Sequence, residues 1–307
     1  MDRMTLATRA FHTTSDFPAL FANIAVKRLR QAYEEQKPTY QIWARRAPNA
    51  PDFKTMQVTM LSGAPDLLPV NEAGEFKFGT MTDGKETYNL VTVGRIVALS
   101  RQAIINDDLR GFDRLIGAFG GSAARYENRT MYATLTANAA LINDGVALFH
   151  ATHGNLGTGA GSALQFSSLS TAATAMYLQK GLQNEELNLQ PVSLIVPAAL
   201  RQTAWQLTSA NYVPTQQSNV NEFRDGGRAA LNVISDAVLD STSSTAWYLC
   251  ANNGQIDTCE YAYLDGAEGP VIEQEMGFEV DGMQFKCRLD FAGKAIDYRG
   301  LYKSNGV

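Results

Sequence analysis

The feature that most constrains the fold is a long stretch of helical periodicity between Ile105 and Leu141. Apolar residues recur there at intervals of three and four, which places them on one stripe of an α-helix. These residues are Ile105, Leu109, Phe112, Ile116, Phe119, Ala123 and Tyr126. A continuous helix from Leu109 to Leu141 has a length of roughly 50 Å at the standard rise per residue. A helix of this length is unusual in a compact enzyme core.

Small residues continue this stripe toward its C-terminal end. They are Ala133, Ala137 and Ala140. Because their side chains are short, the second half of the helix is expected to lie close against a neighbouring element. Gly117, Gly120 and Gly121 each cost about 1 kcal/mol of helix stability relative to alanine. A bend or thinning of the helix is therefore expected near Gly120.

Composition indicates a globular protein without a membrane span. The chain has 307 residues, of which 45% are hydrophobic, enough for one large domain or two moderate ones. Its longest apolar run, Val192 to Leu200, is interrupted by Ser193 and Pro197 and is far shorter than the roughly 20 residues a span needs. Residues 1–14 lack the apolar region of a secretory signal. The expected compartment is the cytoplasm.

Cysteines and charge add two expectations. Cys250, Cys259 and Cys287 form no CxxC pair and are odd in number, which is typical of reduced, buried thiols. The first 50 residues carry eight Lys or Arg and four Asp or Glu, whereas residues 216–290 carry four and thirteen. A basic N-terminal region can face a polyanion, or it can simply keep the protein soluble.

The N-terminal half contains a helix and then a ribbon. Asp16 and Pro18 predict the start of a helix that ends before Pro38. Its outward basic residues are Lys27, Arg28 and Arg30. Further on, residues 75–81 and 86–91 flank Asp83-Gly84, a strong hairpin signal. The resulting ribbon has few large apolar residues, so it must lean on a neighbouring molecule or on the chain's own core.

The C-terminal half reads as short strands separated by helices. A hairpin is predicted around Asp281-Gly282, between strands at residues 270–280 and 283–291. No internal repeat is visible. Clusters of strands separated by helices favour an α+β fold over a regular alternation of strand and helix.

His150 and His153 are the strongest candidates for chemistry, since two imidazoles three residues apart can reach one metal ion. No HExxH motif or matching acidic signature accompanies them. The favoured interpretation is that both rings hydrogen-bond in a tight loop; the alternative is a metal-dependent hydrolase. The glycine-rich segment after them lacks the lysine of a phosphate-binding loop, and no GxSxG motif exists. We therefore expect no enzyme, no cofactor and no metal.

Two segments carry a family resemblance. They are LTANAALINDGVALFHATHGNLG at Leu135 to Gly157 and FKCRLDFAGKAIDYRGLYKSNG at Phe285 to Gly306. With the order of elements, they resemble the major capsid protein of tailed bacteriophages, which has the Hong Kong 97 fold, and most closely the Mu-like head proteins. Many relatives begin with a scaffolding segment or a fused protease. Neither is recognised here, so a processed form or a separate scaffold is expected.

The resemblance implies a division of the chain. Residues 1–50 are similar to the N-terminal arm and residues 51–89 to the E-loop. Residues 90–185 and 270–307 correspond to the P-domain, with a spine helix at Leu109 to Leu141, and residues 186–269 correspond to the A-domain.

The resemblance also implies a function in a virion capsid. Subunits assemble in the host cytoplasm into hexamers and pentamers of an icosahedral head, with portal, scaffold or protease as partners during assembly. The head encloses double-stranded DNA without sequence specificity, and Lys27, Arg28 and Arg30 are DNA-facing candidates. Candidates for contacts between subunits are Phe53, Met56, Phe76, Lys77, Phe78, Lys85 and Tyr88.

Two related alternatives remain. An encapsulin-type compartment has the same fold but holds cargo enzymes instead of DNA. The other alternative is a shell cross-linked covalently through Lys77 or Lys85, for which the spacing of residues identifies no partner asparagine or catalytic glutamate.

Overall fold

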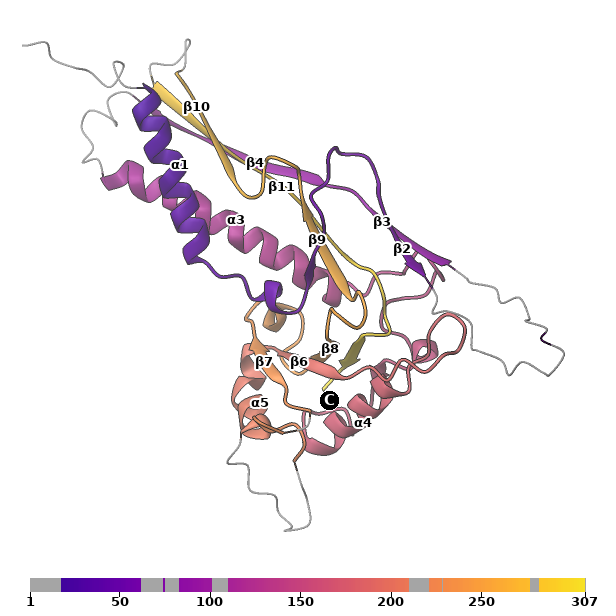
Figure 1. Cartoon of the computed structure of the whole chain (residues 1–307). Coiled ribbons are helices and arrows are strands. Elements are labelled where there is room, and N and C mark those ends of the chain that lie inside the picture. The colour runs from indigo at the N-terminus through magenta and orange to yellow at the C-terminus, as the bar shows by residue number, and fades with distance from the viewer. Residues whose placement is uncertain are drawn as a thin grey trace, which may run out of the picture. The chain divides into compact units, whose positions relative to one another are not determined.

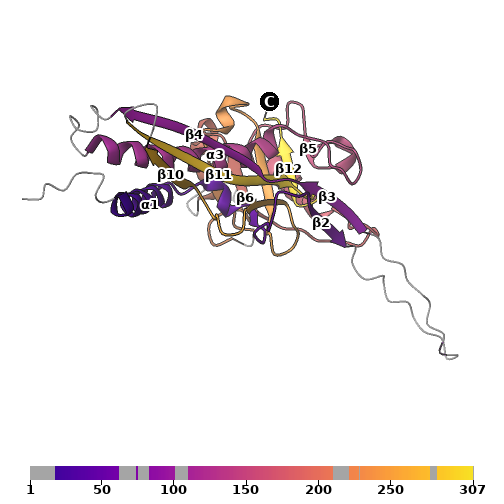
Figure 2. The same cartoon turned by 90° about the horizontal axis from the view of Figure 1, so that it is seen from above.

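The computed structural model confirms the predicted α+β mixture of elements (Figures 1 and 2). It describes residues 18–61, 74, 83–100, 110–209, 221–227, 229–276 and 282–306. The α-helices in these ranges are α1 (Pro18–Glu35), α3 (Arg110–Thr136), α4 (Phe166–Tyr177) and α5 (Arg201–Thr208). Short 3-10 helices lie at Thr39–Ile42, Ala151–His153, Ala198–Leu200 and Leu239–Ser241.

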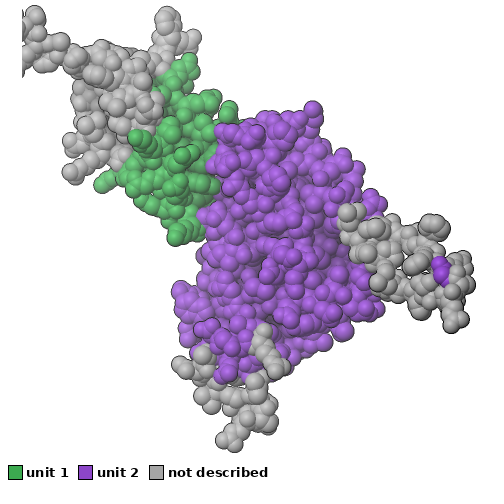
Figure 3. Space-filling model, in the orientation of Figure 1, with its two compact units in different colours: residues 1–37, 92–124, 269–289 green, residues 38–91, 125–268, 290–307 purple. Residues whose placement is uncertain are grey.

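The chain divides into two compact units (Figure 3). Unit 1 comprises residues 1–37, 92–124 and 269–289, and unit 2 comprises residues 38–91, 125–268 and 290–307. Helix α3 and strand β11 (Gly282–Ala295) contribute residues to both units. Each unit is therefore assembled from segments that are distant in the sequence.

Unit 1 contains α1, the first part of α3 and a set of long strands. Strand β10 (Val271–Met276) runs antiparallel to β11 with Met276 opposite Met283, as the predicted hairpin requires. The turn itself lies outside the described residues. Strand β4 (Val91–Ser100) also pairs with β11. Gly94 of β4 allows this close approach, since an added Cβ would lie 2.7 Å from the Cys287 carbonyl oxygen.

Unit 2 contains the larger core. Strand β9 (Cys259–Tyr263) pairs in parallel with β1 (Arg45–Arg46) and antiparallel with the later residues of β11. A second sheet has the strand order β5-β12-β8-β6-β7. Its strands are β5 (Leu156–Gly157), β12 (Leu301–Ser304), β8 (Trp247–Ala251), β6 (Pro191–Val196) and β7 (Asn232–Ser235). Buried residues of α4 and α5 join this second sheet in one apolar cluster, which includes Leu169, Ala204, Leu194 and Trp247.

A two-stranded ribbon in unit 2 differs from the prediction. Strands β2 (Met56–Leu61) and β3 (Asp83–Tyr88) are antiparallel, with Leu61 opposite Asp83. Asp83-Gly84 therefore begins a strand and does not form the predicted turn. The reason is strand pairing, because Asp83 and Gly84 lie opposite Leu61 and Met60 in the ribbon. The residues between the strands are described only at Gly74.

Helix α3 matches the predicted periodicity but not its full length. It is uninterrupted from Arg110 through its glycines to Thr136, so the predicted spine is five residues too long at its C-terminal end. The chain leaves the helix at Asn138, whose φ of 48° lies in the left-handed region typical of helix ends. Ala133, Ala137 and Ala140 are exposed, so the expectation that these alanines lie against a neighbouring element is wrong within the described chain.

The glycines of α3 serve helix packing within unit 1. A Cβ at Gly120 would lie 2.7 Å from the Leu29 carbonyl oxygen and 3.0 Å from the Tyr33 amide nitrogen of α1. At Gly117 the nearest atom is the Ala32 Cβ, at an ordinary 3.8 Å. Gly120 therefore sets the closest approach of α1, whereas Gly117 has room for a methyl group.

Substituting the two glycines should give opposite results. Gly117→Ala gains helix propensity and should stabilise the chain by up to about 1 kcal/mol. Gly120→Ala gains the same propensity but forces the α1 backbone away, so we expect a net loss of about 1–3 kcal/mol. Urea unfolding of the two full-length variants checks this. An equal stabilisation by both would contradict the packing role of Gly120.

Candidate functional site

The β2–β3 ribbon rests on the chain's own core. Met56, Val58 and Met60 are partly buried against a cluster that includes Ala262 and Ile296. Residues on the other side of the ribbon are exposed, namely Gln57, Thr59, Asp83 and Lys85. Of the two supports that the sequence left open, the chain's own core is the one found for these strands. Met56 is therefore bound mainly within its own chain.

Tyr88 is also held inside the chain. It is 8% exposed, and its hydroxyl donates a 2.7 Å hydrogen bond to Oε1 of Glu260. Burial and this bond raise the pKa of Tyr88 above its usual range. Arg45 pairs with the same Glu260 through Nη2 at 2.5 Å and also with Asp257. Tyr88 thus anchors β3, and its predicted place in a contact between subunits does not fit this burial.

Glu86 is the polar centre of the ribbon. It is fully buried, and its Oε1 accepts hydrogen bonds from the amides of Ile142 at 2.6 Å and Asn143 at 3.0 Å. Its Oε2 lies 3.3 Å from Nζ of Lys294, an ion pair that is not aligned as a hydrogen bond. One carboxylate therefore ties β3 to the loop after α3 and to β11. Glu86 is not among the residues predicted from the sequence.

Of the other five residues predicted to contact a neighbouring subunit, the structure describes two. Phe53 is 50% exposed just before β2, and Lys85 is exposed opposite Thr59. Their side chains are free to meet another molecule. Phe76, Lys77 and Phe78 lie outside the described residues.

The basic residues of α1 lie at the surface of unit 1. Lys27, Arg28 and Arg30 are exposed, as predicted, while Leu29 between them is buried against Ile116 and Cys287. Arg28 donates a hydrogen bond to Oε1 of Gln31 at 2.9 Å. The structure shows that these cations are exposed, and their contact with DNA stays a prediction.

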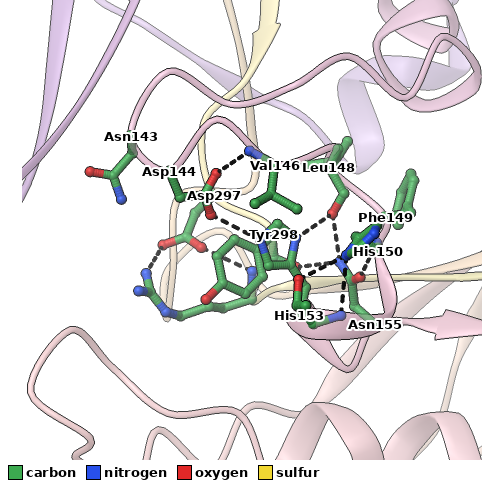
Figure 4. A network of polar contacts seen from close by, with 12 residues as sticks. Asn143, Asp144, Val146, Leu148, Phe149, His150, His153, Asn155, Asp297 and Tyr298 are labelled. Atoms are coloured by element: carbon green, nitrogen blue, oxygen red, sulfur yellow. Dashed lines mark hydrogen bonds and ion pairs between the residues drawn. The ribbon is translucent and has the colours of Figure 1, made fainter.

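His153 and His150 have separate environments (Figure 4). The His153 ring is buried, with Nε2 2.9 Å from Oδ2 of Asp144 and Nδ1 3.3 Å from the Leu148 carbonyl oxygen. It stacks on Tyr298 at 3.7 Å between ring centroids, with an interplanar angle of 6°. His150 is exposed, and its ring accepts a hydrogen bond from the Thr152 amide. The interpretation of both rings as hydrogen-bonding groups in a tight loop is confirmed.

Two asparagines complete the fixation of this loop. Asn155 is fully buried and donates to the Leu148 carbonyl at 2.8 Å. The Oδ1 atom of Asn138 accepts a hydrogen bond from the Phe149 amide at 2.7 Å, and its Nδ2 atom donates one to the Phe149 carbonyl oxygen at 3.2 Å. The side chains of His153, Asn155 and Asn138 all form hydrogen bonds with other groups of this loop. This arrangement is a structural support for residues 138–155.

His153 should therefore matter for stability and His150 much less. His153→Ala removes both ring hydrogen bonds and the contact with Tyr298, so we expect a loss of about 2 kcal/mol in the free energy of unfolding. His150→Ala removes only an exposed cap and should cost less than about 1 kcal/mol. Thermal unfolding of both variants with and without added zinc is the measurement. A large zinc-dependent stabilisation that requires both histidines would contradict the structural role.

The described part of the chain contains neither a candidate metal site nor a candidate membrane-spanning helix. Within the described ranges, no group of three or more His, Cys, Asp or Glu side chains is placed to hold a metal ion. Among the helices the structure describes, none combines the length and apolar character that crossing a bilayer requires.

The chain was compared with known proteins. A family model described as phage capsid protein matches residues 84–304. A search of curated proteins finds no match.

Solved structures with a similar fold come from several sources. A chain from Microbacterium phage Oxtober96 is 10% identical with a TM-score of 0.57, and the match covers 99% of this chain and 96% of that one. The capsid of Ralstonia phage GP4 is 11% identical with a TM-score of 0.57, covering 85% and 87%. A virus-like particle from Pyrococcus furiosus is 9% identical with a TM-score of 0.53, covering 92% and 99%. These likenesses concern the fold.

Proposed function

The chain belongs to the phage capsid protein family, and we propose that it assembles into hexamers and pentamers of a closed icosahedral head around double-stranded DNA. The observation that carries this is the family match over residues 84–304. The protein is a major capsid protein of the virion shell, and it has the α+β fold of Hong Kong 97 type that its sequence predicts. Its family is one of structural proteins. We propose in addition that the chain has no catalytic activity. The closer relation to Mu-like head proteins stays a prediction.

The predicted parts of the subunit are proposed with the same boundaries. Residues 1–50 form the arm, 51–89 the E-loop, 90–185 and 270–307 the P-domain, and 186–269 the A-domain. Helix α3 supports the assignment of a spine, although it ends at Thr136. The exposed side of the β2–β3 ribbon supports contact of residues 51–89 with a neighbouring subunit, because Phe53 and Lys85 remain accessible there.

DNA, portal, scaffold and protease are proposed partners, and the host cytoplasm is the proposed place of assembly. The exposed cations of α1 support the first of these. Arg and Lys that neutralise phosphates release counterions from DNA, which gives affinity without sequence specificity. Such binding suits a shell that must accept any packaged sequence.

Two other functions have different degrees of support. An encapsulin-type shell has the same fold, and the likeness to the Pyrococcus furiosus particle keeps it as the second candidate. The metal-dependent hydrolase has less support, because His153 faces Asp144 and Leu148 whereas His150 bonds within its own turn.

The test is particle formation by the full chain expressed alone. We expect closed shells of uniform diameter in negative-stain micrographs and by light scattering. Particles from the native source should contain nuclease-protected double-stranded DNA. Chains that remain monomeric under all assembly conditions would contradict self-assembly, and shells filled with an enzyme instead of DNA would favour the encapsulin. Stoichiometric zinc with hydrolytic activity would revive the hydrolase.

A further inference from the structure

Helix α3 has one exposed face that the fold leaves uncovered within the described chain. The exposed residues of this face are Arg114, Ala118, Ser122, Arg125, Arg129 and Ala133. They follow one another at intervals of three or four, so they form a continuous stripe along a single helix. The opposite side of the helix is buried through Ile116, Glu127 and Met131.

The stripe carries positive charge only. Arg114, Arg125 and Arg129 are exposed, and none of them forms an ion pair with a residue that the structure describes. The acidic side chain in this part of the helix, Glu127, is fully buried and accepts a hydrogen bond from the Tyr40 hydroxyl at 2.8 Å. The three cations therefore face outward without a neutralising carboxylate on the same stripe between positions 114 and 133.

The geometry of a helix fixes the spacing of these arginines. With 3.6 residues per turn they fall within an arc of about 60°, and with the standard rise they lie about 16 Å and about 6 Å apart along the axis. The positions between them are alanine and serine, whose small side chains leave the guanidinium groups as the outermost atoms. A straight polyanion can therefore approach the helix along its length.

We propose that this face of α3 is a binding surface for the phosphate backbone of double-stranded DNA, in addition to the α1 cations. The inference rests on the proposed function and names the residues that carry out its DNA contact. The duplex presents one negative charge per about 1.7 Å of its axis, so a row of cations of this length meets several phosphates. A guanidinium can bind a phosphate through two parallel hydrogen bonds. The surface reads no bases, which fits packaging of any sequence.

The test compares two triple variants of the full chain. In R114Q/R125Q/R129Q the stripe loses its charge. In the control K54Q/K180Q/R224Q, three other exposed cations are removed, so both variants lose the same net charge. Binding of a short fluorescent DNA duplex is followed by anisotropy over a range of salt concentrations. Light scattering verifies that the chain is unassembled in each measurement. An oligoglutamate peptide serves as a second probe.

We expect the stripe variant to bind DNA more weakly and with a shallower salt dependence. The slope of log K against log salt should fall by about 0.9 for each phosphate contact removed, or about 2.7 for all three. The control should keep the wild-type slope to within one such contact. Equal slopes in both variants, or a loss of oligoglutamate binding while DNA binding is kept, would overturn the inference.

Shell formation separates this inference from the proposed function. Negative-stain micrographs of the stripe variant should show shells like those of the wild type, since the substitutions lie on an exposed face. If the wild type forms shells and the stripe variant binds DNA as tightly as the wild type does, only the proposed DNA contact of α3 is refuted. Failure of the wild type to form shells would refute the proposed function, whatever the stripe variant does.

Discussion

Glu86→Ala should lower the free energy of unfolding by about 3–5 kcal/mol, the range for breaking a buried, hydrogen-bonded ion pair by removing one partner. The variant leaves the amides of Ile142 and Asn143 without their acceptor. It also leaves Lys294, whose side chain is only 25% exposed, without its carboxylate. Three elements lose their common contact at once. Urea unfolding of the unassembled full chain measures the effect.

Matched variants separate charge from hydrogen bonding. Glu86→Gln keeps an oxygen that can accept the two amides and loses only the ion pair, so a smaller loss than with alanine is expected. This variant also keeps the test informative if the alanine variant does not fold. Asp83→Ala, an exposed position of the same strand, should change stability by less than about 0.5 kcal/mol. A loss below about 1 kcal/mol for Glu86→Ala would show that the carboxylate does not hold these elements together.

Local sequence signals were sufficient where neighbouring residues decide the structure. Pro18 at the start of α1 and the apolar spacing in α3 both predict the helices that are found. The hairpin of β10 and β11 is predicted because strand patterns flank Asp281-Gly282. In each case the signal is a pattern or turn preference within a few residues, and no distant contact opposes it.

Distant contacts explain the errors. Asp83-Gly84 has the sequence of a turn, but these two residues pair with Leu61 and Met60 of β2, which lie well before them in the chain. Ala133, Ala137 and Ala140 suggested close packing, yet Ala133 of α3 and the two alanines that follow the helix are exposed. A sequence pattern gives the spacing of a helix face but does not say which face the rest of the chain covers.

The candidate surfaces also include features that local sequence predicts and features that depend on distant contacts. Exposure of Lys27, Arg28 and Arg30 follows from the helical pattern of α1 and was predictable. Burial of Tyr88 and Glu86 depends on Glu260 and Lys294, far away in sequence, and was not. One signal was nevertheless present, since alternation in a strand places Glu86 on the same face as Tyr88. A carboxylate on an apolar strand face is stable only if a cation or hydrogen-bond donors pair with it, so its position predicts such a partner.

The second large effect is expected from removing the segment between β2 and β3. Leu61 and Asp83 are directly opposite in the ribbon, so replacing residues 62–82 by Asn-Gly can close the two strands with a tight turn. This replacement keeps Glu86 and its hydrogen bonds to the amides of Ile142 and Asn143. The shortened chain should fold with an unchanged or higher unfolding midpoint, since a shorter loop costs less closure entropy.

Shell formation by the shortened chain should nevertheless be abolished, if residues 51–89 extend over a neighbouring subunit as proposed. Electron microscopy and light scattering measure this, with two further variants for comparison. A Gly/Ser segment of the original length tests whether side chains matter, and it should also fail to form shells. Phe76→Ala with Phe78→Ala tests the two predicted aromatic contacts and should raise the concentration needed for assembly. Normal shells from the shortened chain would remove the basis for the E-loop assignment, because a contact that holds neighbouring subunits together cannot be deleted without loss of the shell.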